Sequence, residues 1–146
     1  MQILELTHRL YHVDGEAVES CKGLGFFSGM EAVRNAVVKY QDQPGFCDES
    51  KAFVIRRRTV EGKIADDVLY EAMVYVHTPD FQGDFEMNIE LGLFGDEAHA
   101  NRAVEQFVKD NREFLENPEF EVERIVNRWK LDECGGWLYG FEVVRY

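Results

Sequence analysis

The sequence has 146 residues, of which 45% are hydrophobic, 30% charged and 13% aromatic, and its formal net charge at pH 7 is −12. This length and composition fit one folded domain and exclude a disordered chain. The negative charge repels phosphate backbones and anionic lipid headgroups, so we expect no nucleic-acid partner and no membrane partner.

The first half of the chain predicts three strands. Residues 2–12 are rich in β-formers and aromatics, residues 18–27 are a second strand-like run, and Asp14-Gly15 between them is a typical turn signal. Residues 52–60 form a third strand-like run.

A helix is predicted between the second and third strands. Ser28 and Glu31 have the spacing of a capping box, which marks a helix start, and Pro44-Gly45 ends the helix. The apolar residues between them recur at helical spacing: Val33, Ala36, Val37 and Tyr40.

The second half predicts the same kinds of element. Its strands are expected at residues 69–78, 85–94, 119–131 and 136–146. Asp96 is a predicted N-cap, and an apolar helical stripe follows it: Ala100, Ala103, Val104 and Phe107.

The two halves align with each other. Leu24-Gly25-Phe26-Phe27 aligns with Leu91-Gly92-Leu93-Phe94, and Arg57 aligns with Arg124. We therefore predict a single domain, 1–146, made of repeat one, 1–66, and repeat two, 67–146. The predicted fold class is α+β: a tandem β-β-α-β repeat with a mainly antiparallel sheet, two helices on one face and a pseudo-twofold axis.

The first repeat resembles a small uncharacterised bacterial β-β-α-β domain family. The resemblance lies in residues 8–15, in 24–28, in 31–37, in Pro44-Gly45-Phe46 and in Phe53-Val54-Ile55. The second repeat is similar through Phe120-Glu121-Val122 but has Gly95 in place of Ser28 and lacks the Pro-Gly-Phe motif. The family has no assigned activity, so the resemblance implies a fold and no function.

Arg57 and Arg124 are the candidate binding residues. Alternation along each strand directs both side chains towards the helix-covered face, where an arginine needs a carboxylate, a helix C-terminus or solvent. We predict that they are polar anchors at the rim of each half, and they are also a candidate weak anion site. Arg56 and Arg58 alternate with Arg57 and are interpreted as a solvated basic strip, the alternative being a pairing with Glu121 and Glu123.

No catalytic or metal site is predicted. Gly23–Ser28 lacks the third glycine of a phosphate loop. Three carboxylates on one strand, and a histidine pair near one cysteine, are each interpreted as structural or solvated rather than metal-binding because neither set is complete. These residues are Glu119, Glu121 and Glu123, and His8, His12 and Cys21.

The cysteines and the ends of the chain indicate a location. Cys21, Cys47 and Cys134 are odd in number and far apart, so they predict no disulfide framework, and buried small hydrophobic roles are favoured over nucleophilic ones. The N-terminus lacks the pattern of a signal peptide, and no apolar run is long enough to span a membrane. We therefore expect a cytoplasmic protein.

The sequence favours a non-enzymatic binding or protein-interaction module without a cofactor, whose partner is another protein or a second copy of the chain. The alternative is a small-ligand-binding or enzymatic protein with a pocket between the two repeats. Four aromatic residues are candidates to line such a pocket, although core roles are favoured for them: Tyr70, Trp129, Trp137 and Tyr139.

Overall fold

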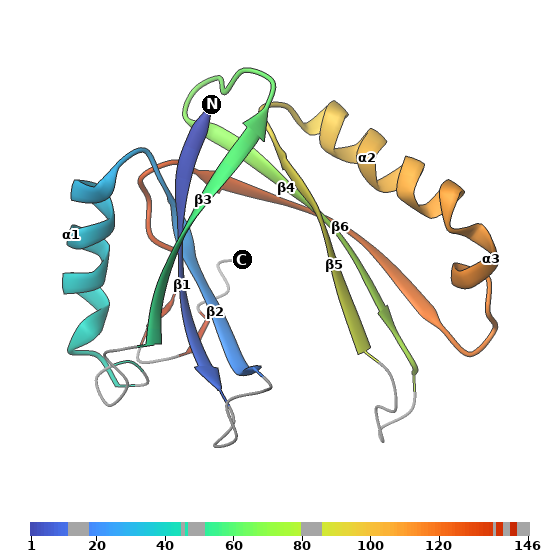
Figure 1. Ribbon diagram of the computed structural model, residues 1–146, viewed down its shortest axis with the longest axis horizontal. Coiled ribbons are helices and arrows are strands. Elements are labelled where there is room, and N and C mark those ends of the chain that lie inside the picture. Colours follow the sequence, from blue (N-terminus) through green and yellow to red (C-terminus); the bar gives the residue numbers. More distant parts are fainter. Residues whose placement is uncertain are drawn as a thin grey trace. The chain divides into compact units, whose positions relative to one another are not determined.

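The computed structural model describes residues 1–11, 18–44, 46, 52–79, 86–135, 137–138 and 141–142. The chain forms two compact units (Figure 1). The α1 unit comprises Gln2–Thr59 and Lys130–Tyr146, and the α2 unit comprises Met1 and Val60–Trp129. Each unit is described by itself.

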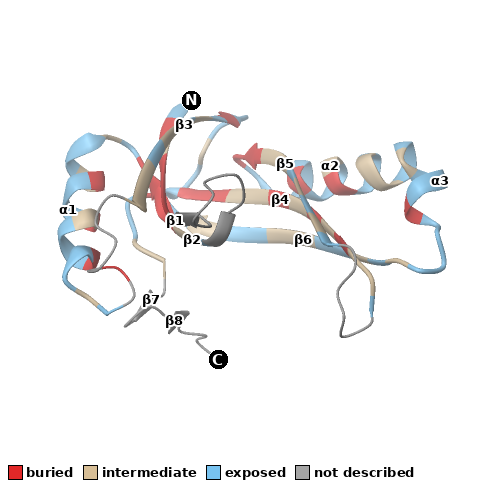
Figure 2. Cartoon of the chain, turned by 60° about the horizontal axis from the view of Figure 1, so that its bottom comes forward, coloured by how far each residue is buried: buried red, intermediate tan, exposed pale blue. Residues whose placement is uncertain are grey.

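The α1 unit has a three-stranded antiparallel sheet with one helix. Strand β1 (Gln2–Tyr11) lies between β2 (Val18–Phe27) and β3 (Phe53–Glu61), and helix α1 (Met30–Gln41) follows β2. Figure 2 shows buried positions recurring along one side of α1 while much of the helix is exposed. These positions and the facing strand residues form the core: Leu6, Leu24, Phe27, Val33, Ala36, Tyr40 and Phe46.

The α2 unit contains the strand order β5-β4-β6. Strands β4 (Val68–His77) and β5 (Glu86–Phe94) are antiparallel. Helix α2 (Glu97–Asp110) and the short α3 (Arg112–Leu115) precede β6 (Glu121–Lys130). Its core consists of Ala72, Val74, Val76, Phe94, Ala100, Val104 and Leu115.

Both helices lie close to the positions expected from the apolar stripes, but the predicted N-cap is correct only for α2. Asp96 is the N-cap of α2, as predicted, and its side chain accepts a hydrogen bond from the His99 backbone N–H at 2.9 Å. The capping box predicted for α1 is wrong, because the N-cap is Gly29, which has no side chain for a cap hydrogen bond. The Ser28 side chain contacts a different residue, described below.

Two glycines permit matching irregularities in the two units. Gly25 in β2 and Gly92 in β5 both have φ of +144°, a conformation that side-chain-bearing residues rarely adopt. Each lies at a shift in strand register, opposite Leu6 in one unit and Ala72 in the other. The shifts are β-bulges, which bend the strand locally.

The predicted fold class is wrong. The structure is mostly sheet, with 48% of residues in strands and 28% in helices, and its six main strands are mixed rather than mainly antiparallel. The last residues of β3, Val60 and Glu61, belong to the α2 unit and run parallel to Leu93 and Phe94 of β5. A third helix, α3, adds the buried Leu115, so the described chain is not a two-helix tandem β-β-α-β repeat. The fold class was predicted wrongly because alternation identifies the buried face of a strand but specifies neither the neighbouring strand nor its direction.

The C-terminal part also differs from expectation. In place of one strand over 136–146, the described residues form a short hairpin of β7 (Trp137–Leu138) and β8 (Phe141–Glu142). The segment before it lies beside the end of β2, where the backbone N–H groups of Asp132 and Gly135 donate to Phe26 and Leu24 at 2.9 and 2.7 Å. None of the helices in the described residues combines the length and apolar character that a membrane crossing requires.

Candidate functional site

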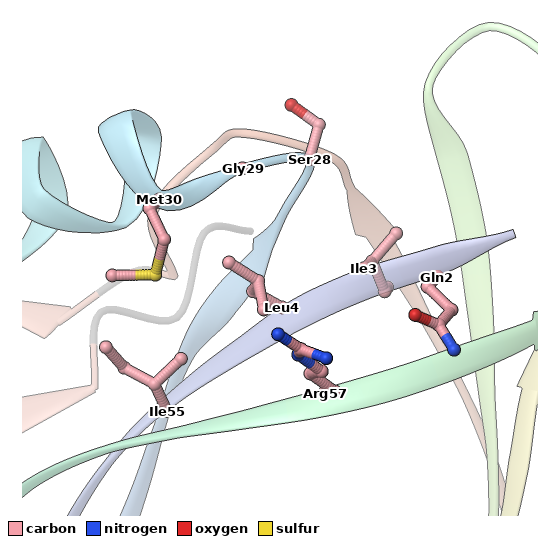
Figure 3. A pocket seen from close by; sticks show the side chains of 8 residues that line it. All are labelled: Gln2, Ile3, Leu4, Ser28, Gly29, Met30, Ile55 and Arg57. Carbon is pink, nitrogen blue, oxygen red and sulfur yellow. The ribbon is translucent and has the colours of Figure 1, made fainter.

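A pocket lies within the α1 unit at the start of helix α1 (Figure 3). Its cavity volume is about 420 Å³, which is within the range of small-molecule sites. Three segments of the unit supply its lining, namely the start of β1, the turn into α1 and the middle of β3. The lining residues are Gln2, Ile3, Leu4, Ser28, Gly29, Met30, Ile55 and Arg57.

Strand pairing places Arg57 and Ile55 on one face of the sheet. Arg57 lies opposite Leu4, and Ile55 lies opposite Leu6, a residue of the core beneath α1. Because side chains two residues apart on a strand point to the same side, Arg57 and Ile55 both project towards the face that α1 covers. Arg57 therefore has the orientation that its alternation predicted.

The apolar part of the pocket is accessible. Ile55 is 42% exposed and Met30 is 41% exposed, and both are among the large hydrophobic residues that the described chain leaves exposed. Figure 3 shows the Met30, Leu4 and Ile55 side chains grouped together at one end of the site. An apolar portion of a ligand would be shielded from water by this group.

The polar part of the pocket is positively charged. Within the described part of the chain, Arg57 has no hydrogen-bond or ion-pair partner, and it is exposed. Gly29 begins α1 without a side-chain cap, but Glu31 lies in the first helical turn and the Asp132 carboxylate binds Ser28, so the positive charge of the pocket comes from Arg57. Among the described residues, the pocket lining contains no Asp or Glu.

Ser28 at the edge of the pocket is held from the C-terminal part of the unit. Its backbone N–H and its hydroxyl donate to the two carboxylate oxygens of Asp132, at 2.8 and 2.7 Å. Asp132 has a positive φ of 65°, a conformation that aspartate tolerates better than most residues. The turn into α1 is thereby fixed by a residue that follows β6.

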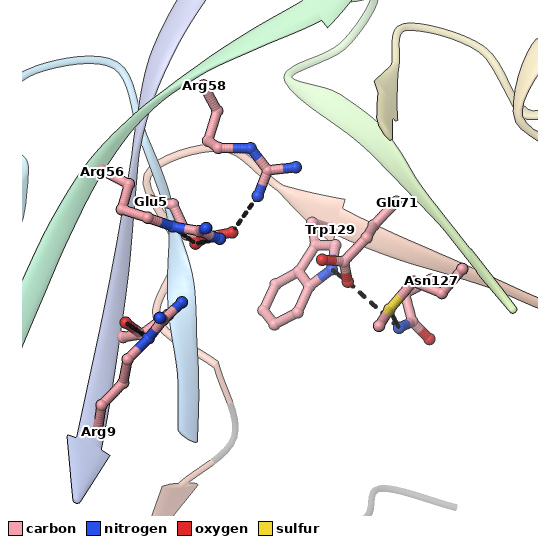
Figure 4. Close-up of polar contacts among 9 residues, drawn as sticks. Glu5, Arg9, Arg56, Arg58, Glu71, Asn127 and Trp129 are labelled. Carbon is pink, nitrogen blue, oxygen red and sulfur yellow. Dashed lines mark hydrogen bonds and ion pairs between the residues drawn. The ribbon is translucent and has the colours of Figure 1, made fainter. Parts of the chain in front are cut away.

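The opposite face of β3 carries an ion-pair cluster (Figure 4). Arg56 donates from Nε and Nη2 to Oε1 of Glu5 at 2.9 and 2.5 Å, and Arg58 donates from Nη1 to Oε2 at 2.5 Å. The Glu5 side chain is only 7% exposed, and that of Arg58 is 14% exposed. The interpretation of Arg56 and Arg58 as a solvated strip is therefore wrong, because β1 places a buried carboxylate between them.

Arg124 has a different environment from Arg57. It lies in the α2 unit, and its Nε is 3.0 Å from Oε1 of Glu105 on helix α2. Both side chains of this ion pair are at least half exposed. The structure gives Arg124 a carboxylate partner on its own helix-covered face, whereas Arg57 lines the pocket, so the two positions are not chemically equivalent.

The predicted metal-ligand candidates are dispersed. His8 is fully buried, with its ring 5.0 Å from the rings of both Phe46 and Phe53, while Cys21 is exposed. His12 and Cys47 lie outside the described residues. Nothing in this arrangement brings the His8 ring to Cys21 as a ligand set.

The acidic strand of the α2 unit has local partners. Glu121 Oε2 lies 3.6 Å from Nε2 of His77, and Glu123 acts on Tyr75, where burial first and then Glu86 and Glu123 raise the pKa of the phenol. Glu119 precedes β6 and is exposed. The three carboxylates therefore do not converge on one point of the described structure.

Two candidate aromatics occupy defined positions in the α2 unit. The Trp129 indole N–H donates to Oε1 of Glu71 at 3.2 Å (Figure 4), and Tyr70 packs against the core of the unit. The side chains of Trp137 and Tyr139 lie outside the described residues. The pocket in the α1 unit is formed by other residues. Of these, Arg57 was predicted as a binding residue, whereas the others were assigned only to strands or to the start of the helix.

Tyr40 and Cys134 form a buried polar contact near the end of α1. The Tyr40 hydroxyl donates to the Gly135 carbonyl at 2.6 Å, and Cys134 packs against the core of the unit. Burial first, and then the adjacent Cys134, raise the pKa of Tyr40 far above its ordinary value. A thiol packed against the core fits the small hydrophobic role expected for this cysteine.

Comparison of the chain with protein-family models, with curated proteins and with solved structures finds no match in any of the three. The resemblance to an uncharacterised bacterial domain family therefore stays a prediction.

Proposed function

We propose that this protein is a non-enzymatic cytoplasmic binding module whose pocket at the start of α1 binds an anionic group attached to an apolar one. The observation that carries this proposal is that Arg57, without a polar partner among the described residues, lines a pocket of about 420 Å³ beside exposed apolar side chains. An unpaired guanidinium favours carboxylate or phosphate, which it can bind bidentately.

The positive charge of the pocket contrasts with the acidic composition of the whole chain. The chain carries 28 acidic residues against 16 lysines and arginines, yet none of the described residues that line the pocket is acidic. A carboxylate entering the pocket would give Arg57 the kind of partner that Glu105 provides for Arg124 elsewhere in the chain. The apolar lining of Leu4, Met30 and Ile55 selects for a ligand with a hydrocarbon portion.

The lining also supports binding rather than catalysis. Its described residues include no His, Cys, Asp, Glu or Lys, which are the side chains that most often transfer protons or act as nucleophiles. The one hydroxyl, that of Ser28, donates its proton to the Asp132 carboxylate in the described structure. Binding of a partner's anionic group is the function that this chemistry favours.

The test is a thermal-shift titration with hexanoate, using hexanamide as the neutral probe of nearly equal shape. We expect hexanoate to raise the melting temperature by mass action and hexanamide to raise it less. Arg57→Gln should abolish the difference between the two probes, whereas the matched variant Arg124→Gln should keep it. Equal responses of the parent protein and Arg57→Gln to hexanoate would contradict the proposal.

A further inference from the structure

We infer that the outer edge of β3 is a docking strand for an extended acidic peptide, which pairs antiparallel to residues 53–57 and places an acidic side chain on Arg57. The inference rests on the proposed function and extends it, because it names the kind of partner that carries the anionic group. It follows from the hydrogen-bonding pattern of β3, the direction of its side chains and its charge.

The hydrogen-bonding pattern shows which backbone groups point outward. Val60 donates to the Met1 carbonyl at 2.9 Å, and the Met1 amine donates back to the Val60 carbonyl at 3.4 Å, so these two residues face each other across the ladder. In an antiparallel pair this arrangement recurs at every second residue, which directs the backbone groups of Arg58 and Arg56 towards β1 as well. The residues between them direct their N–H and C=O groups to the other side: Phe53, Ile55 and Arg57.

This outer side is available in the described structure. Among the described residues, β3 pairs on that side only through its last two residues, Val60 and Glu61, which adjoin β5. No described strand pairs there with residues 53–57. A row of unpaired backbone groups is a template for an added strand, and this mode of recognition obtains affinity from main-chain hydrogen bonds.

The side chains connect this edge to the pocket. Ile55 and Arg57 both line the cavity and are two residues apart, so an added strand would place its own residues of the same spacing beside them. Directly opposed side chains on neighbouring strands have Cβ atoms about 4.5–5.5 Å apart, which is close enough for an ion pair and an apolar contact. The matching peptide therefore has an acidic residue opposite Arg57 and, two residues later, an apolar residue opposite Ile55.

Charge selects an acidic peptide over a second copy of this chain. Arg56 and Arg58 pair with Glu5, whereas the Arg57 guanidinium has no carboxylate partner among the described residues. In an antiparallel pairing of two β3 edges over residues 53–57, Arg57 of each copy would lie opposite Phe53 of the other, so its guanidinium would gain no carboxylate partner. An acidic segment of another protein instead supplies the complementary charge.

The test measures binding of a fluorescein-labelled peptide, Thr-Glu-Thr-Leu-Thr with both ends blocked, by fluorescence polarisation. In the antiparallel pairing the N–H groups of its Glu and Leu point towards β3, and those of its second and third Thr point away. We expect N-methylation of Glu and Leu to weaken binding at least tenfold and N-methylation of the two Thr to change it less than threefold. Replacing Glu by Gln in the peptide, or Arg57 by Gln in the protein, should also weaken binding about tenfold.

A second measurement reports the backbone pairing directly. The amide N–H groups of Ile55 and Arg57 should exchange with deuterium more slowly in the presence of the peptide, while that of Arg56, already directed to β1, should change little. If N-methylation of Glu and Leu weakens binding no more than N-methylation of the two Thr, the docking strand is refuted. It is also refuted if exchange at Ile55 and Arg57 is unchanged by the peptide. Hexanoate binding that still depends on Arg57 would then leave the proposed function standing. Failure of both hexanoate and the peptide to bind would refute both.

Discussion

Ser28 and Asp132 are 104 residues apart in the chain, and both donors of Ser28 bond to the carboxylate of Asp132. Ser28 precedes the first turn of α1 and lines the pocket, so this contact fixes the pocket edge from the far end of the sequence. The neighbouring Glu133 makes only a local, exposed contact, with Lys130 at 3.4 Å.

Replacing Asp132 should therefore lower the stability of the protein more than replacing an ordinary surface residue does. Asp132→Gly removes both hydrogen bonds but keeps the positive φ of 65° without strain. We expect the free energy of unfolding to fall by about 1–3 kcal/mol, since the lost bonds include charge-assisted ones. Urea denaturation measures the change, and Glu133→Ala is the control, expected to change stability by less than about 0.5 kcal/mol. Equal effects of the two variants would argue against a structural role for the Ser28 contact.

The cluster of Glu5 with Arg56 and Arg58 predicts a non-additive set of mutations. Glu5→Gln removes the charge between two guanidinium groups in a mostly buried site, and we expect a loss of about 3–5 kcal/mol. The triple variant Glu5→Leu, Arg56→Leu, Arg58→Met should lose less stability than Glu5→Gln, because the Glu5 carboxylate and the two guanidinium groups that pair with it are removed together. Chemical denaturation of both proteins checks this order, and the reverse order would contradict it.

Gly25 and Gly92 offer a matched pair because both have φ of +144°. A side chain at either position strains the backbone, at a cost on the order of 1–3 kcal/mol. At Gly25 an added Cβ would also lie 2.7 Å from the Glu133 carbonyl oxygen, whereas at Gly92 the nearest atom would be 3.4 Å away, at the end of a Phe94 ring. We expect Gly25→Ala to lower the melting temperature more than Gly92→Ala, and differential scanning calorimetry can compare them.

Tyr40 should make stability depend on alkaline pH. Its pKa in the folded state is raised from the ordinary 10.0, first by burial and then by Cys134. Above about pH 10 the unfolded chain releases this proton while the folded chain retains it, so the folded state loses stability as pH rises. Tyr40→Phe should be less stable at pH 8, because the bond to Gly135 is lost, but should lose less further stability between pH 8 and 11.

Urea unfolding at a series of pH values checks this expectation. The stability curves of the parent protein and of Tyr40→Phe should approach each other as the pH rises above 10. Curves that stay parallel over this range would show that the Tyr40 hydroxyl titrates alike in the folded and unfolded chains.

Local pattern located most of the regular elements. The stripe from Val33 to Tyr40 and the N-cap at Asp96 identified α1 and α2, because helical periodicity and capping are encoded within a few residues. Alternation also oriented Arg57 towards the helix-covered face.

The remaining features depend on residues that are distant in sequence. The parallel pairing of Val60 with Leu93 and the position of Glu5 between two arginines require knowledge of which strands are neighbours. The capping-box spacing at Ser28 was misleading because its hydroxyl bonds to Asp132 instead. One turn was also not predicted from the sequence. Asp66 and Asp67 both have positive φ, as in the tight hairpin turns that are usually made by Asn-Gly, and two aspartates are a weaker sequence signal for such a turn.

The α1 unit is discontinuous in the chain, whereas all of the α2 unit except Met1 is the single stretch Val60–Trp129. During synthesis a ribosome releases the chain from the N-terminus, and domains generally fold as their residues emerge. The pocket strands and α1 emerge before the α2 stretch, yet Asp132 and Gly135, which bond to Ser28 and Tyr40, emerge after it. The nascent α2 stretch can therefore complete its own core while the earlier-made part still waits for its final segment, so the order of maturation is the reverse of the order of translation.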